Sequence, residues 1–195
     1  SSVYDLNAPD LDESILEMDC PVLGICYGLQ LLIQKYNGKV ISSSKGEYGF
    51  EEIYIKDSNC ILDGFPQTSQ VWMSHGDKVN NISENWKILA VSSNEVIAAV
   101  KNNNKNIYGV QFHPEVVHTI EGKKLLSNFL FNISNLEPNW TSKNFINNTI
   151  KMIKEKVGDN ESVICGLSGG VDSSVVATLL HKAIGERSKC VFIDH

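Results

Sequence analysis

The pentapeptide Gly24-Ile25-Cys26-Tyr27-Gly28 constrains the fold of this chain more than any other segment. A short apolar run at 21–25 precedes the cysteine, and a helical stripe of apolar residues at 29–36 follows it. This order predicts a sharp strand-to-helix turn, which the small glycines allow. A cysteine there is exposed at a helix N-terminus, where we expect backbone N–H groups to lower the thiol pKa and to stabilise an oxyanion. For the pentapeptide alone, a buried cysteine in a tight turn is an equal alternative.

A histidine near the end of a later apolar run is the candidate general base. On an extended chain, His113 and Glu115 project to the same side, and Pro114 favours that extended geometry. A base oriented by a carboxylate is what an activated thiol requires. His75 is a competing base, with Asp77 two residues on, but the glycine between them leaves that backbone free to turn.

Hydrophobic periodicity divides the chain into two parts, with a linker at 134–139 that contains Pro138. Helices are predicted at 29–36 and 121–133 in the first part, and at 142–157 and 173–184 in the second. Strands are predicted at 21–25, 39–41, 52–55, 71–73, 88–91, 96–100 and 107–112, then at 162–167 and 189–194. We therefore expect an α/β chain with domains at 1–137 and 138–195, the second beginning a parallel sheet with a βαβ unit.

The first part resembles the class I glutamine amidotransferase domain, a mixed open sheet flanked by helices. The resemblance implies that Cys26 is the nucleophile, His113 the base and Glu115 the orienting carboxylate in the hydrolysis of glutamine through a thioester. It also implies a glutamine pocket lined by Tyr27, Gln30, Ser74, His75 and Gly76. The opening residues resemble the segment after the family's Gly-Gly-Pro oxyanion loop, so the N-terminal part of the domain is expected to be missing.

A second constellation lies between the predicted strand 162–167 and the helix that follows it. Adjacent glycines let the backbone approach a ligand closely, and the helix N-terminus offers free N–H groups to an anion. No lysine follows the glycines, so this is not a Walker A loop. The segment resembles the PP-loop of N-type ATP pyrophosphatases, which implies ATP binding by Ser168, Gly169, Gly170, Val171, Asp172, Ser173 and Ser174. Asp172 is a candidate Mg²⁺ ligand, with an N-cap role as the alternative.

The order of the two constellations resembles the glutamine-hydrolysing GMP synthetase family. It implies that ATP adenylates XMP and that ammonia from glutamine displaces AMP to form GMP. It also implies a full-length homodimer whose C-terminal pyrophosphatase and dimerisation regions are absent here, so this piece is not expected to be fully active alone. The alternative is a non-catalytic or regulatory fragment or paralogue that binds glutamine or nucleotide.

Charge and hydropathy exclude some classes of partner and of location for this protein. The 195 residues contain 17 Lys+Arg and 23 Asp+Glu, a net charge of −6, without a basic stripe. This balance argues against nucleic acid as the main partner. No apolar run approaches the roughly 18 residues of a membrane span. We therefore expect a cytoplasmic protein.

Overall fold

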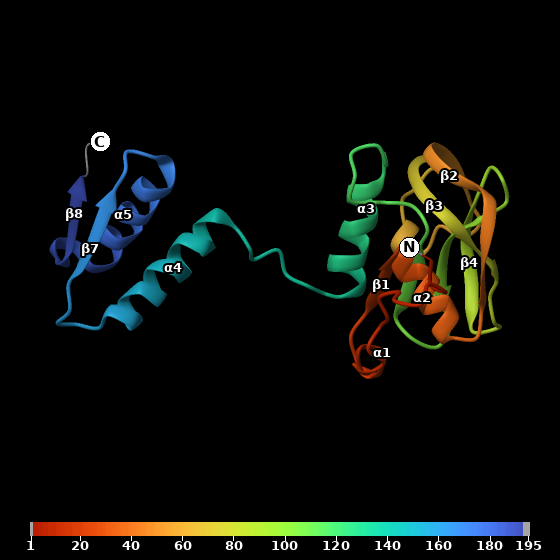
Figure 1. The fold of residues 1–195 in the computed structure, drawn as a ribbon, viewed down its shortest axis with the longest axis horizontal. Helices are drawn as coiled ribbons and strands as arrows, with labels where there is room; N and C mark the ends of the chain where they lie inside the picture. Colours follow the sequence, from red (N-terminus) through yellow and green to blue (C-terminus); the bar gives the residue numbers. More distant parts are fainter. Residues whose placement is uncertain (1, 193–195) are drawn as a thin grey trace. The chain divides into compact units, whose positions relative to one another are not determined.

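The computed structural model describes residues 2–192, without the side chains of 43–45. The chain divides into two compact units, Ser1–Leu136 and Glu137–His195 (Figure 1). The predicted boundary near Pro138 lies next to this division. Each unit is described by itself below.

The first unit is built on a mixed sheet of six strands in the order β1-β6-β5-β4-β2-β3. The short strands β1 and β6 pair in parallel, and every other neighbouring pair is antiparallel. The strands are β1 (Val22–Ile25), β2 (Lys39–Ile55), β3 (Thr68–Asn81), β4 (Trp86–Ser92), β5 (Ile97–Asn102) and β6 (Ile107–Val110). A mixed α/β sheet was the predicted class, and the structure confirms it.

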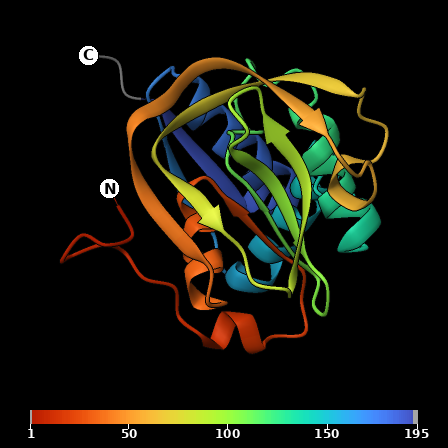
Figure 2. The same cartoon turned by 90° about the vertical axis from the view of Figure 1, so that its right-hand side faces the viewer.

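Two strands are far longer than predicted. The runs at 39–41 and 52–55 belong to the single strand β2, and the run at 71–73 is the middle of β3. The two strands pair along their length, with a register shift between Ser42 and Glu47, and curve around one side of the sheet (Figure 2). Serines and glycines interrupt the apolar alternation, so periodicity shows only parts of each strand. Cross-strand pairing continues at Ser42, Gly49, Ser69 and Ser74.

The helices of the first unit are α1 (Ser14–Glu17), α2 (Tyr27–Lys35), η1 (Cys60–Leu62), α3 (Gly122–Ser127) and η2 (Asn128–Ile133). The sequence did not predict α1 or η1. The single helix predicted at 121–133 is wrong in detail, because α3 continues as the π-helical segment η2. The change begins at Asn128, whose buried amide donates to the carbonyls of Ile61 at 3.2 Å and Asp63 at 2.9 Å. These bonds hold the helix against η1.

The second unit contains the predicted βαβ arrangement. Its elements are α4 (Ser142–Val157), β7 (Val163–Leu167), α5 (Val171–Ile184), η3 (Gly185–Arg187) and β8 (Ser188–Phe192), and β7 pairs with β8 in parallel. Thr141 caps α4 by accepting the N–H of Asn144 at 3.2 Å, and Gly158 ends it with φ 70°. The last two residues of the strand predicted at 189–194 lie outside the described residues.

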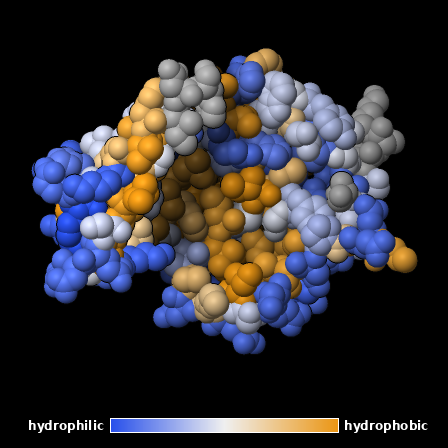
Figure 3. All heavy atoms as spheres, turned by 60° about the vertical axis from the view of Figure 1, so that its left-hand side comes forward, coloured by the Kyte–Doolittle hydropathy of each residue, from blue (hydrophilic) through white to orange (hydrophobic). Residues whose placement is uncertain are grey.

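Burial differs between the two units. In the first, α2 buries Leu29, Leu32 and Ile33, and the sheet buries a larger cluster that includes Phe112 and Leu125. In the second, the buried apolar residues among those described are Cys165, Ala183 and Ile184, and large apolar side chains are exposed. Figure 3 shows many apolar side chains at the surface. Among residues 2–192, no helix has the length and apolar character that a bilayer crossing requires.

Candidate active site

Cys26 occupies the junction between β1 and α2 in a strained conformation. Its backbone has φ 51° and ψ −103°, a region that costs a residue with a side chain about 1–3 kcal/mol. Its N–H donates to the carbonyl of Val110 at 2.7 Å, which fixes the turn against β6. A Cβ at Gly24 would lie 2.7 Å from the Gly28 carbonyl carbon, so the close approach within this turn requires a glycine at 24. The predicted elbow is therefore present.

His113 and Glu115 face each other as predicted. The Nδ1 atom of His113 lies 2.7 Å from Oε1 of Glu115. The backbone N–H of His113 donates to the Trp72 carbonyl at 3.0 Å, and the buried hydroxyl of Thr119 donates to the His113 carbonyl at 2.6 Å. The same hydroxyl accepts the N–H of Trp72 at 3.1 Å. Thr119 thus ties the base to β3, a role that no sequence signal indicated.

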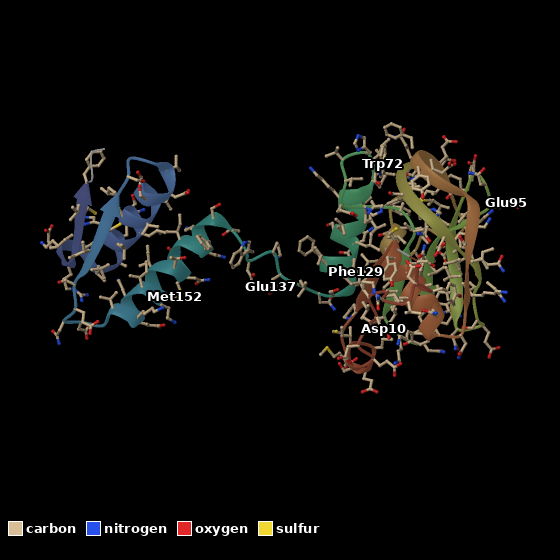
Figure 4. All side chains as sticks on the ribbon, viewed as in Figure 1. Asp10, Trp72, Glu95, Phe129, Glu137 and Met152 are labelled. Atoms are coloured by element: carbon tan, nitrogen blue, oxygen red, sulfur yellow. The ribbon has the colours of Figure 1, made fainter. Side chains whose placement is uncertain are left out.

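Cys26 and His113, the candidate nucleophile and base, both contact β3. The Cys26 Sγ atom lies 3.8 Å from the Ser74 carbonyl, while His113 is bonded to Trp72, labelled in Figure 4. Positions i and i+2 of a strand are about 6.6 Å apart, so the β3 residues that contact the Cys26 sulfur and the His113 backbone are close neighbours. The hydrogen bonds of the sulfur itself go to Ser74 and to the side chain of Gln111 at 3.6 Å, rather than to His113.

The thiol of Cys26 differs from the prediction in its electrostatics. Burial raises its pKa most, the N–H of Tyr27 and the amide of Gln111 lower it, and the Glu115 carboxylate raises it again. The predicted lowering by an N–H at the helix N-terminus is present, through Tyr27, but the net pKa of Cys26 is raised. Burial outweighs this donor. A thiol of this kind requires a base to remove its proton, which is the role expected of His113.

A cavity of about 340 Å³ opens beside Cys26. Its lining includes all five residues that the resemblance placed there: Tyr27, Gln30, Ser74, His75 and Gly76. Pro9, Tyr48 and Asp77 complete it, and the Tyr27 hydroxyl donates to the Pro9 carbonyl at 2.7 Å. The structure therefore gathers Cys26 and the expected pocket residues around one cavity.

The competing base His75 is fully engaged elsewhere. Its Nε2 lies 3.1 Å from Oε2 of Glu47, and its Nδ1 lies 2.9 Å from the backbone carbonyl of Asp77, not from the Asp77 carboxylate. Burial raises the pKa of Glu47, but hydrogen bonds from His75, Asn94 and Ser92 outweigh it, so the pKa lies below its usual value. Gly76 left this backbone free to turn, but Ser74–Asp77 continue β3.

The glycine-rich loop of the second unit has the geometry of an anion site. Gly169 has φ 80°, which favours glycine, and Gly170 is the N-cap of α5. The hydroxyls of Ser173 and Ser174 donate to the Gly170 carbonyl at 3.0 and 2.9 Å. A cavity of about 740 Å³ adjoins the loop and reaches the start of α4.

Asp172 lies in the first turn of α5, inside the cap, so its alternative N-cap role is wrong. Among the described side chains, no three potential metal ligands gather at one point. A single carboxylate beside phosphate oxygens still suits Mg²⁺, which binds through one or two carboxylates and substrate phosphates.

Comparison with known proteins places these features in a family. Residues 2–133 match the family described as "Glutamine amidotransferase class-I". The chain belongs to the class I glutamine amidotransferases. Residues 143–193 match a second family, described as "NAD synthase".

Relatives with both parts are also known. The chain is 50% identical to the GMP synthase [glutamine-hydrolyzing] of Brachyspira hyodysenteriae and 50% identical to that of Clostridium kluyveri, each over all 195 residues. It spans 38% of the length of each relative. The crystal structure of a protein from Thermoplasma acidophilum, described as "a putative gmp synthase subunit a protein", superposes with a TM-score of 0.58 at 30% identity, over 60% of this chain and 59% of that one.

In this amidotransferase, the sequence analysis did not predict three residues of the candidate site. Pro9 reaches the pocket from a segment without periodicity, and Thr119 acts through a hydroxyl that resembles any other in the sequence. Gln111 is part of the segment around His113, but its contact with the Cys26 sulfur depends on tertiary structure. Tyr48, which also lines the pocket, comes from the long strand β2.

Proposed function

We propose that the first unit hydrolyses glutamine to glutamate and ammonia. Sγ of Cys26 attacks the side-chain carboxamide carbon, and the thiol proton passes through His113 to the leaving nitrogen, which departs as ammonia. Water then attacks the thioester, with His113 as base, and glutamate leaves. The backbone N–H of Tyr27 is one donor for the oxyanion of each step. Atoms balance as glutamine and water in, and glutamate and ammonia out.

The strained elbow carries this proposal. A cysteine at φ 51° whose sulfur contacts the cavity wall at Ser74 has little structural purpose, since the strain costs stability. The His113–Glu115 pair supports it, because Glu115 at Nδ1 leaves Nε2 as the atom available for proton transfer.

The pocket suits an amino acid with a free α-ammonium group. Oδ2 of Asp77, a residue of the cavity lining, is buried and has no hydrogen-bond partner among the described residues. A buried carboxylate oxygen without a partner is costly, so a cation is its expected ligand. We propose that Asp77 accepts the ammonium of glutamine while Gln30, Ser74 and Gly76 surround the rest of the substrate.

For the full protein, we propose GMP synthesis from XMP, ATP and glutamine. Here Ser168–Ser174 hold the phosphates of ATP, adenylation of XMP releases pyrophosphate, and ammonia from the first unit displaces AMP. The relatives named as GMP synthases and the Gly169 geometry support this proposal. The chemistry requires adenylation first, because the XMP oxygen is otherwise a poor leaving group.

Four further properties of the protein stay predictions. They are domains at 1–137 and 138–195, Mg²⁺ held in part by Asp172 with ATP, a homodimer of the full protein, and a cytoplasmic location.

The experiment compares two nitrogen sources in the full-length protein. Cys26→Ala is expected to abolish glutamine hydrolysis and glutamine-dependent GMP formation, while GMP formation with added ammonium persists. Cys20→Ala, at an exposed free cysteine, is the matched control and should change neither activity. Glutamine hydrolysis that survives Cys26→Ala would refute the nucleophile. A wild-type protein that binds glutamine without hydrolysing it would instead support the non-catalytic alternative.

A further inference from the structure

Gln111 connects the nucleophile to the glutamine pocket through a buried row of amides. Its side chain is fully buried, at 0% exposure. Its Nε2 lies 3.6 Å from Sγ of Cys26, and its Oε1 accepts a hydrogen bond from Nε2 of Gln30 at 3.3 Å. Gln30 Nε2 also donates to the backbone carbonyl of Asp77 at 2.9 Å. The row therefore runs from the β3 backbone to the reacting sulfur.

Chemistry at the Asp77 end determines which way each amide points. A backbone carbonyl can only accept, so the Gln30 group that faces it must be the NH₂. The second N–H of that NH₂ points at Gln111, whose oxygen must therefore face Gln30. The NH₂ of Gln111 is left to face Cys26. The side-chain amide of Gln111, which could otherwise be flipped by about 180°, is thus held with its NH₂ group toward the Cys26 sulfur.

A donor at this place matters because the sulfur is buried. Burial disfavours the thiolate of Cys26, and the Glu115 carboxylate adds a like charge. The N–H of Tyr27 and the amide of Gln111 are the two donors that oppose these effects. The Tyr27 N–H is also the donor expected to serve the oxyanion, so it cannot serve the thiolate alone once substrate is bound.

We propose that Gln111 is a further catalytic residue, whose Nε2–H stabilises the Cys26 thiolate before attack and holds Gln30 in its pocket-lining orientation. The inference rests on the proposed glutamine hydrolysis. It assigns no new bond-making step to Gln111, whose amide keeps its protons throughout.

Two substitutions in the full-length protein separate the donor from the packing. Gln111→Met removes the donor and the contact with Gln30. Gln111→Glu keeps an oxygen for Gln30 but replaces the donor with a like charge. We expect the rate of iodoacetamide reaction at Cys26 to fall about tenfold at pH 7 in Gln111→Met, because the thiolate loses one of its two hydrogen-bond donors. The fall should be larger in Gln111→Glu.

The pH profile of alkylation, read by mass spectrometry of the Cys26 peptide, should move to higher pH in the same order. Gln67→Met is the matched control, because its amide bonds the Ile55 carbonyl. Unchanged profiles in both folded Gln111 variants would overturn the proposal. Wild-type protein with the expected profile but without glutamine hydrolysis would overturn the proposed function instead and leave the thiolate contact standing.

If the Gln111 variants do not fold, the contact between Gln111 and Cys26 can be tested in the wild-type protein. One pair of glutamine side-chain amide resonances should shift with pH through the Cys26 titration in the wild-type protein. The shift should vanish in Cys26→Ala. The proposal would be overturned if no glutamine side-chain amide resonance shifted with pH through the Cys26 titration.

Discussion

The two units of this chain present their candidate sites in opposite ways. In the first, buried apolar clusters on the sheet and α2 hold Cys26, His113 and the pocket through bonds from three strands. In the second, the glycine loop stands on a parallel pair of strands, and side chains such as Trp140 and Val171 are 81% and 78% exposed. A site that must hold a strained nucleophile needs surroundings that fix it, whereas a backbone anion site needs only one loop and one helix.

The preformed site of the first unit should depend on the base itself. His113→Gln is expected to lower kcat for glutamine hydrolysis by about 10³-fold, within the range of general-base catalysis. His118→Gln is the matched control, because this exposed ring stacks on Trp72 at 4.6 Å without reaching the thiol. Steady-state kinetics of the purified full-length variants measure kcat for glutamine hydrolysis in both. Equal losses in the two variants would show that His113 has no special role.

Hydrogen exchange should show the difference in burial directly. Amides of β5 and β6 are expected to exchange at least about 100-fold more slowly than those of β7 and α5, because few buried contacts oppose local opening in the second unit. Mass spectrometry of the 195-residue chain measures both regions in one sample. Equal protection would mean that exposed apolar surface does not weaken the second unit.

The loop of the second unit should depend on backbone conformation alone. Gly169→Ala is expected to weaken ATP binding by the full-length protein about tenfold, because a left-handed φ costs a residue with a Cβ roughly 1–2 kcal/mol. Gly170→Ala is the matched control, with φ −80° and only an ordinary contact for the new Cβ. Titration with ATP measures both. A greater loss at Gly170 would refute the conformational argument.

The smallest expected effect concerns the buried pair that supports the pocket. The pKa of Glu47 lies below its usual value of 4.5, so its ionised form stabilises the fold above that pH and the contribution is lost as the pH falls. Glu47→Gln should therefore lower the free energy of unfolding by about 1 kcal/mol at pH 7 and by less at pH 4.

Urea unfolding at both pH values gives the comparison for Glu47. Glu51→Gln, at a carboxylate on the same strand, is the control and should change the free energy of unfolding less at pH 7. A Glu47→Gln effect that is the same at both pH values would contradict the linkage.

Local patterns predicted the elbow, the βαβ unit and the α4 bounds, because each depends on residues close together in sequence. They failed where contacts between segments that are distant in sequence determine the backbone conformation. Gly76 leaves the backbone beside His75 free to turn, yet pairing with β2 holds His75 and Asp77 in a strand. The π-helical segment likewise depends on an amide bonded to carbonyls more than sixty residues earlier.

The sequence by itself determined which residues are the candidates for the proposed chemistry, because Cys26, His113 and the glycine loop each lie in a short motif with its own geometry. Only the tertiary structure decided how they are used. It raised the pKa of Cys26 by burial, occupied both nitrogens of His75, and placed Gln111 against the sulfur. Electrostatic environment and hydrogen-bond partners come from segments that meet only when the sheet forms, so no local pattern can contain them.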